Sequence, residues 1–125
     1  MSGPTTLHWL AAKRILRYLK GTIDLGIFYK REEGNATLVA FTDIGYASDI
    51  DDRRSTFGYV FKIRNGVVSW SFKKQLVVSL SITEAGYIAA ALCACHCTCL
   101  KRIQGEIGIV EDGATVISSD NSSFI

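Results

Sequence analysis

Three acidic residues stand at positions where a fold can bring their carboxylates together. Asp43 follows the apolar run 38–42, and Asp120 follows the run 115–119, so both lie at the ends of expected strands. Glu84 lies in the first turn of a long helical stretch. Strand ends and helix starts hold side chains on a rigid frame. Three carboxylates together would suit a hard cation such as Mg²⁺, which prefers oxygen ligands and phosphate substrates.

Two of these acids also have a simple structural explanation. Glu84 would serve as a first-turn acid that the helix dipole favours, and Asp120 with Asn121 would serve as a helix cap or turn. Asp43 is harder to explain by structure alone, because buried carboxylates are rare unless they are paired or bound to a ligand. We therefore interpret Asp43 as functional and leave both readings open for the other two.

Four basic residues are candidates for contacts with phosphate groups. Arg53 and Arg54 lie in the charged loop 48–55, and Lys73 and Lys74 follow a later apolar run. Such side chains position a nucleic acid without reading its sequence, although a solvated turn explains them equally well. The net charge is only +2, so any affinity for nucleic acid must come from local patches.

All four cysteines lie within a seven-residue stretch of the long helical segment. On a helix, Cys93 and Cys97 share one face, and Cys95 and Cys99 share another. Zinc sites usually take paired ligands from separate elements, whereas cysteine is a common small core residue. We predict core cysteines and neither a zinc site nor a disulfide framework, because the spacing within one helix is unsuitable.

Composition indicates one globular domain. The chain has 125 residues, of which 48% are apolar and 21% charged, enough for a single core. The first residues lack the apolar segment of a signal peptide, and the longest apolar stretch, 87–95, is far shorter than a bilayer span. We expect an intracellular protein, cytoplasmic or nuclear, with no membrane partner.

Hydrophobic periodicity predicts a mixture of helices and strands. A first helix is expected at 6–20, capped by Thr5 or Thr6 and ended by Gly21, and a second is expected from 82 to about 107, capped by Ser81 or Thr83. Strands are expected at 25–30, 38–43, 56–63, 67–72 and 115–119, with turns at 31–35 and 64–66. This order predicts an α/β or α+β fold with a mixed sheet and flanking helices.

Four ordered blocks resemble one known family. They are HWLAAKRILRYLKG at 8–21, FTDIGYASDIDDRRSTFGYVF at 41–61, VSWSFKKQLVVSLSITEAGYIA at 68–89 and SSDNSS at 118–123. The blocks are similar to the ribonuclease H region of the Pol polyproteins of copia-type (Pseudoviridae) retrotransposons. Four blocks in the same order make a far more specific match than one motif alone.

The resemblance implies a ribonuclease H-like fold, with residues 1–22 as the linker helix from reverse transcriptase and 23–125 as an incomplete ribonuclease H-like domain. The family's last strand and helix would be lacking. The implied reaction is Mg²⁺-dependent hydrolysis of the RNA strand of an RNA–DNA hybrid, with Mn²⁺ as a substitute. Asp43, Glu84 and Asp120 match the family's catalytic metal ligands. The implied partners are the hybrid and the reverse transcriptase domain.

A second function stays open beside the enzyme. The family's fourth metal ligand lies further along than Ile125, the last residue of this sequence. The alternative is therefore a catalytically inactive remnant that acts as a nucleic-acid-binding or protein-interaction module. The three matching acids favour the nuclease, and the missing ligand favours the remnant.

Overall fold

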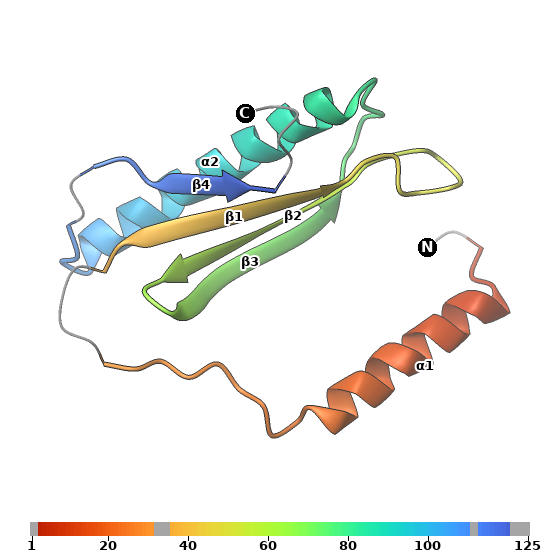
Figure 1. The fold of residues 1–125 in the computed structure, drawn as a ribbon, viewed down its shortest axis with the longest axis horizontal. Helices are drawn as coiled ribbons and strands as arrows, with labels where there is room; N and C mark the ends of the chain where they lie inside the picture. The colour runs from red at the N-terminus through yellow and green to blue at the C-terminus, as the bar shows by residue number, and fades with distance from the viewer. Residues whose placement is uncertain (1–2, 32–35, 111–112, 121–125) are drawn as a thin grey trace.

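A four-stranded mixed sheet with one long helix on one face forms the body of the protein (Figure 1). The computed structural model describes residues 3–31, 36–110 and 113–120. The elements are α1 (Thr6–Gly21), β1 (Leu38–Gly45), β2 (Thr56–Ile63), β3 (Gly66–Lys74), α2 (Ile82–Glu106) and β4 (Val116–Ser119). The strand order is β3-β2-β1-β4, with β1 parallel to β4 and the other two pairs antiparallel. The predicted mixed sheet is confirmed.

Strand β1 is central in the sheet, as predicted, but only one of its faces is buried. Leu38, Ala40 and Thr42 are buried, whereas the intervening Phe41 is 46% exposed. Successive side chains of a strand point to opposite faces, and α2 covers one face only (Figure 1). The apolar run of β1 therefore supplies both the core and part of an open face of the sheet.

The core lies between β1, β2 and α2. Strand β2 contributes three buried aromatic rings at alternate positions, Phe57, Tyr59 and Phe61. Helix α2 opposes them with small residues four positions apart, among them Ala85, Ala89, Cys93 and Cys97. Small side chains at this spacing allow a helix to pack closely on a sheet.

The prediction of core cysteines is confirmed for two of the four. Cys93 and Cys97 are buried, Cys95 and Cys99 are exposed, and all four are free thiols. Burial, together with the neighbouring Cys97, raises the pKa of the Cys93 thiol to about 11. Cys93 is therefore a protonated, inert core residue at neutral pH.

His96 joins α2 to two strands of the sheet. Its Nδ1 lies 3.2 Å from the Tyr59 hydroxyl, and its Nε2 lies 3.1 Å from the Ser69 hydroxyl. Its ring stacks on Phe61 at 5.2 Å between centroids. The partners of His96 are hydroxyl groups, so its role is in packing.

The β2–β3 hairpin turns at Arg64 and Asn65, since Ile63 pairs with Gly66. Arg64 has a φ of 54°, a conformation that this short turn imposes. The ring of Tyr29 lies directly against Gly66, and its hydroxyl donates a hydrogen bond to the Val67 carbonyl. A β-carbon at position 66 would approach Tyr29 Cδ1 to 2.4 Å, so the absent side chain makes this contact possible.

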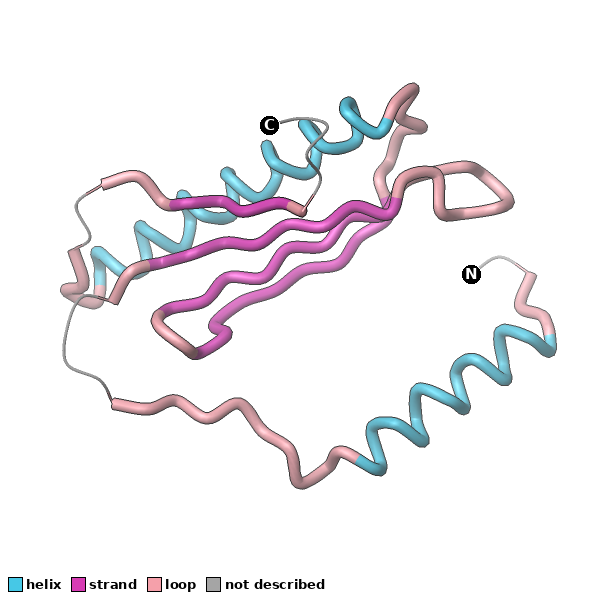
Figure 2. The backbone as a smooth tube through the Cα atoms, viewed as in Figure 1, coloured by secondary structure: helices cyan, strands magenta, loops and turns pink. Residues whose placement is uncertain are grey.

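The predicted strand at 25–30 is wrong. This stretch has no strand structure, and it joins α1 to the body as an arm (Figure 2). The apolar run has the composition of a strand, but a strand also needs a paired neighbour, and this arm meets the body through the side chain of Tyr29. The predicted turn at 31–35 lies largely outside the described residues.

Helix α1 confirms the prediction for the start of the chain. Thr5 caps it by accepting from the His8 N–H, while the Thr5 N–H donates to His8 Nδ1 at 2.9 Å. No residue of α1 is buried. Figure 1 shows α1 beyond the β3 edge, at a distance from the sheet.

Helix α2 is, within the described ranges, the helix long and apolar enough to cross a bilayer by length and composition. The core helix of a globular protein passes the same test. Its row of buried small residues packs on the sheet. The expectation of no membrane partner stays a prediction.

Candidate functional site

Asp43 and Asp120 lie side by side on neighbouring strands, Asp43 two residues before the end of β1, which extends past the predicted end to Gly45, and Asp120 directly after β4. Thr42 of β1 pairs with Ser119 of β4 in parallel register, so the next residue on each strand is one of the two acids. Both acids are exposed, and both line a hollow of about 670 Å³ on the sheet face away from α2. Two of the three predicted site residues are thus brought together.

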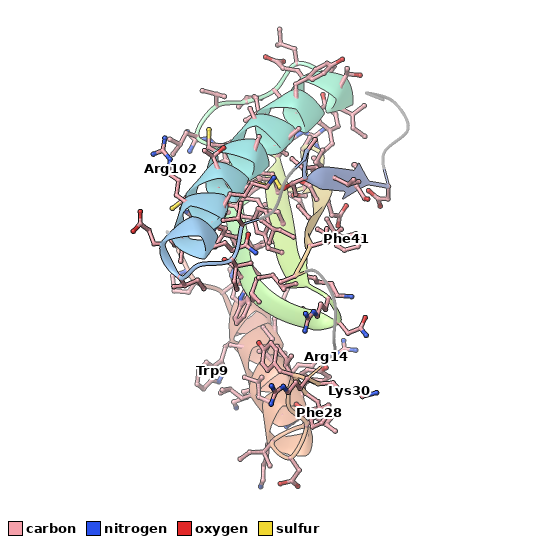
Figure 3. The ribbon with its side chains drawn as sticks, turned by 90° about the vertical axis from the view of Figure 1, so that its left-hand side faces the viewer. Trp9, Arg14, Phe28, Lys30, Phe41 and Arg102 are labelled. Carbon is pink, nitrogen blue, oxygen red and sulfur yellow. The ribbon has the colours of Figure 1, made fainter. Side chains whose placement is uncertain are left out.

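The floor of this hollow is aromatic. Trp70 and Phe72 of β3 are 67% and 75% exposed, and Phe41 of β1 lies on the same face. The label in Figure 3 places Phe41 on the side of the sheet away from α2. A β-carbon on Gly58 would lie 3.3 Å from the Phe72 ring, so this glycine leaves room for the ring. We call the exposed surface formed by Phe41, Val60, Trp70 and Phe72 the open face.

The register places these side chains in two rows across the sheet. One row runs Ser118, Phe41, Val60, Trp70, and the next runs Asp120, Asp43, Gly58, Phe72. The acid pair therefore stands at one end of the open face. This surface was not predicted, although the alternation of Trp70 and Phe72 with serine and lysine in β3 is its signal in the sequence.

One oxygen of the Asp43 carboxylate is hydrogen-bonded to the backbone of the next residue. Its Oδ1 accepts a hydrogen bond from the Ile44 N–H at 2.7 Å. This hydrogen bond orients the carboxylate group. Such local support is what a functional carboxylate on a strand end needs.

The Glu84 carboxylate is hydrogen-bonded to the backbone at the start of α2. Its Oε2 accepts a hydrogen bond from the Leu80 N–H at 2.6 Å, and the Ser81 side chain accepts from the Glu84 N–H at 3.1 Å. Ser81 is the N-cap, so one of the two predicted caps is confirmed. Glu84 does not line the hollow that holds the other two acids. Its carboxylate acts here as a first-turn acid.

The carboxylates do not form a metal site as they stand. No group of three or more His, Cys, Asp or Glu residues in the described part of the chain is arranged to hold a metal ion. Two carboxylates at one edge and a third bound to its own helix do not supply the oxygen ligands that Mg²⁺ requires. The predicted metal ligation of Asp43, Glu84 and Asp120 stays a prediction.

The four predicted phosphate-binding residues differ in whether they form ion pairs with acids of the chain. Lys74 bridges Asp49 and Asp52, with 2.8 Å to the second, and Arg54 lies 3.6 Å from Asp52. Among the ion pairs of the described ranges, none involves Arg53 or Lys73, which are both exposed. Arg53 and Lys73 are therefore the better candidates for contact with phosphates.

The Lys74 ion pairs change the acidity of the loop. The Lys74 ammonium donates to Asp49, and together with the N–H groups of Asp52 and Asp51 it lowers the pKa of Asp49 to about 2. The same ammonium lowers the pKa of Asp52, and the two carboxylates raise the pKa of Lys74. The loop is held in the fully charged state at neutral pH.

A buried glutamine positions the start of α2. Gln75 Nε2 donates to the Ala85 carbonyl at 3.0 Å, and the Ser79 hydroxyl donates to Gln75 Oε1 at 2.7 Å. The Gln75 N–H donates to the Ser55 carbonyl at 2.8 Å. The sequence alone does not predict this role, because Gln75 meets its partners only in the folded chain.

Relatives in known proteins cover nearly the whole chain. The retrovirus-related Pol polyprotein from transposon RE2 of Arabidopsis thaliana is 43% identical over 122 residues, which are 97% of this chain and 8% of that protein. The Pol polyprotein from transposon TNT 1-94 of Nicotiana tabacum is 37% identical over 124 residues, which are 99% and 9%. The chain is a homologue of copia-type transposon Pol polyproteins.

This Pol homologue spans less than a tenth of the length of those two polyproteins. A third relative, secreted RxLR effector protein 161 of Plasmopara viticola, is 49% identical over 88 residues, 70% of this chain and 61% of that protein. No family model matches the Pol homologue, and no solved structure matches it. The structure therefore establishes a mixed four-stranded sheet, and no solved structure assigns this sheet to a named fold.

Proposed function

We propose that the chain is the ribonuclease H-like region of a retrotransposon Pol polyprotein, whose parent activity is endonucleolytic hydrolysis of RNA in RNA–DNA hybrids. The observation that carries this proposal is that Asp43 and Asp120, which follow the paired residues Thr42 and Ser119, line one hollow. Carboxylates at reacting centres orient water and accept its proton when they lie within hydrogen-bond reach. The homologous Pol polyproteins support the origin of the chain.

Charge around the pair limits how a nucleic acid would approach. Two adjacent carboxylates repel phosphate oxygens unless cations lie nearby. Arg53 follows β1 in the loop at the same end of the sheet. Lys73 pairs with Phe57 and lines a hollow with Ile88 of α2, on the opposite face of the sheet. Arg53 would hold the backbone of the hybrid while Asp43 faces the scissile phosphate, and Lys73 would contact a nucleic acid that extends past the β3 edge. The hybrid, and reverse transcriptase as a covalent neighbour, are the partners in this proposal.

Mg²⁺ or Mn²⁺ belongs to the parent activity, but the described side chains do not fit a metal ion as they stand, because Glu84 is held at its helix cap. The proposed role of the acids is therefore limited to orienting water and hydroxyl groups.

Cleavage of a labelled RNA–DNA hybrid tests this function. The chain is incubated with the hybrid in Mg²⁺ and, separately, in Mn²⁺, and is compared with its Asp43→Asn variant. Loss of cleavage by at least 100-fold in the variant is expected, in the range that positioned acid–base groups contribute. Asp24→Asn, on the arm outside the hollow, is the matched control and should cleave as the parent does. Equal cleavage by Asp43→Asn and the parent would reject Asp43 as the functional acid.

A second function has its own observation in its favour. The Glu84 carboxylate is held at its helix cap, a role that an inactive remnant that binds nucleic acid would retain. In that case the folded chain shows no cleavage in either metal but retains affinity for the hybrid. The affinity should fall when Arg53 and Lys73 are both replaced by Ala, and it should decrease with rising salt, because phosphate contacts release counterions.

A further inference from the structure

Within the part of the chain that the structure describes, two apolar surfaces lack a covering element. The first is the open face, with its exposed Phe41, Trp70 and Phe72. The second is α1, in which no residue is buried, although Trp9 and Leu16 belong to an apolar side that also includes Ala12 and Leu19. An apolar helix side and an apolar sheet face in one chain are suited to one another.

The two surfaces match in size. Helix α1 has 16 residues, so it is about 24 Å long at 1.5 Å per residue. Strands β2 and β3 have eight and nine residues, which span roughly 26–30 Å at 3.3 Å per residue. A helix of this length covers the open face from the hairpin to the acid pair.

The two surfaces also match in charge. The polar side of α1 carries Lys13, Arg14, Arg17 and Lys20, and α1 contains no acidic residue. The open face ends at the exposed carboxylates of Asp43 and Asp120. In Figure 3 the labelled Trp9 and Arg14 point to opposite sides of α1. A helix that packs its apolar side on the sheet keeps its basic side chains at the rim, where they complement this acid pair.

The position of α1 indicates which sheet it covers. The arm is fastened at the hairpin end of its own body by the packing of Tyr29 on Gly66. From there α1 lies beyond the β3 edge, whereas Phe41 points from the open face in another direction (Figures 1 and 3). The arm therefore presents α1 to a neighbouring molecule and leaves its own open face accessible.

We infer that a second copy of this chain supplies the partner, and that two copies exchange α1 helices, each helix packing on the open face of the other copy. An exchange of identical elements closes with two-fold symmetry, because every copy gives one helix and receives one. Each dimer then contains two helix–sheet contacts, one from each copy.

The two tryptophans of the chain report on this exchange, since Trp9 lies on α1 and Trp70 on the open face. The full chain is measured by light scattering and by tryptophan emission across a range of concentrations. We expect twice the mass of one chain at high concentration, and an emission maximum that moves to shorter wavelength as the dimer forms.

A matched pair of substitutions tests the surface. Leu16 and Leu10 are 61% and 59% exposed on α1, but Leu10 is spaced three and four positions from Lys13 and Arg14, on the basic side. Leu16→Asp should abolish the dimer and the emission shift, and Leu10→Asp should preserve both. Phe72→Ser removes the acceptor instead of the helix. A mixture of the Leu16→Asp and Phe72→Ser chains should recover a heterodimer with one intact contact.

Three results would overturn the inference. A monomer at every concentration with long-wavelength emission would show that the two surfaces do not meet. A monomer with short-wavelength emission that is independent of concentration would show that α1 packs on its own sheet. A dimer that survives Leu16→Asp would show that the copies associate through another surface.

Discussion

Of the three predicted acids, Glu84 has contacts that indicate a structural role. Its carboxylate accepts the Leu80 N–H at the first turn of α2. Replacing Glu84 by Ala should lower the free energy of unfolding by about 1 kcal/mol, because a capping acceptor and a favourable dipole interaction are lost. Glu84→Gln keeps an acceptor oxygen and should lose less. Urea denaturation of the two variants measures the difference, and an Ala variant as stable as the parent would show that the cap is dispensable.

The Lys74 ion pairs give the charged loop a defined response to acid. The pKa of Asp49 in the folded chain is depressed to about 2 from its ordinary value of 3.8, so its contribution to stability is present above pH 4 and is lost as the pH falls toward 2. Lys74→Met removes the main cause of the depression and should move the titration of Asp49 upward, although the N–H groups of Asp51 and Asp52 still bond to it. Carboxyl chemical shifts measured by NMR follow this titration.

The control for that experiment is Lys73→Met, because Lys73 takes part in none of the ion pairs within the described ranges. It should leave the Asp49 titration unchanged. An unchanged titration in Lys74→Met would mean that the backbone donors alone depress the pKa.

Single residues differ in how far the sequence predicts them. The nearness of Asp43 and Asp120 could be anticipated, because both follow apolar runs and the carboxyl ends of parallel strands meet at one edge of a sheet, although β1 continues past Asp43 to Gly45. The sequence left two roles open for Glu84, a first-turn acid and a metal ligand, and its hydrogen bond from the Leu80 N–H agrees with the first. The bonds of His96 and Gln75 could not, because their partners lie on other elements and only packing decides which groups meet.

The elements follow the sequence where local pattern and pairing agree. The β2–β3 hairpin combines alternating apolar residues with a short turn, so its contacts are nearly all local. The arm at 25–30 has a comparable apolar run but no strand to pair with, and pairing cannot be read from composition. The Tyr29 side chain holds it instead, through its ring on Gly66 and its hydroxyl on the Val67 carbonyl.

That contact gives a prediction at the scale of the arm. In Gly66→Ala, the new β-carbon would overlap the Tyr29 ring, at 2.4 and 2.6 Å from two of its carbons. The ring must leave, so trypsin should cleave the arm near Lys30 and Arg31 at least several-fold faster than in the parent. The sheet should be retained, since Gly66 has an ordinary φ. Tyr29→Phe, which loses only the bond to the Val67 carbonyl, should weaken the attachment by about 1 kcal/mol. Equal cleavage of parent and Gly66→Ala would show that the ring does not hold the arm.

The molecule as a whole divides into a packed body and an appended helix. The body buries one face of the sheet under α2, whereas α1 buries none of its residues. A single helix of 16 residues is only marginally stable in water. At a concentration where the chain is a monomer, α1 should therefore contribute nothing to the cooperative unfolding of the body.

Removal of residues 1–28, which retains Tyr29, tests this division. The shortened chain should unfold in urea with the same midpoint as the full chain at low concentration, with a free energy of unfolding within about 0.5 kcal/mol. Its helical circular dichroism should fall by no more than the share of α1, because α2 depends on the sheet and on the Gln75 bonds for its position. At high concentration the full chain should become the more stable of the two, since association adds stability by mass action and the shortened chain has no helix to exchange. A lower midpoint for the shortened chain at every concentration would mean that α1 stabilises its own body, and the division into body and exchanged helix would be wrong.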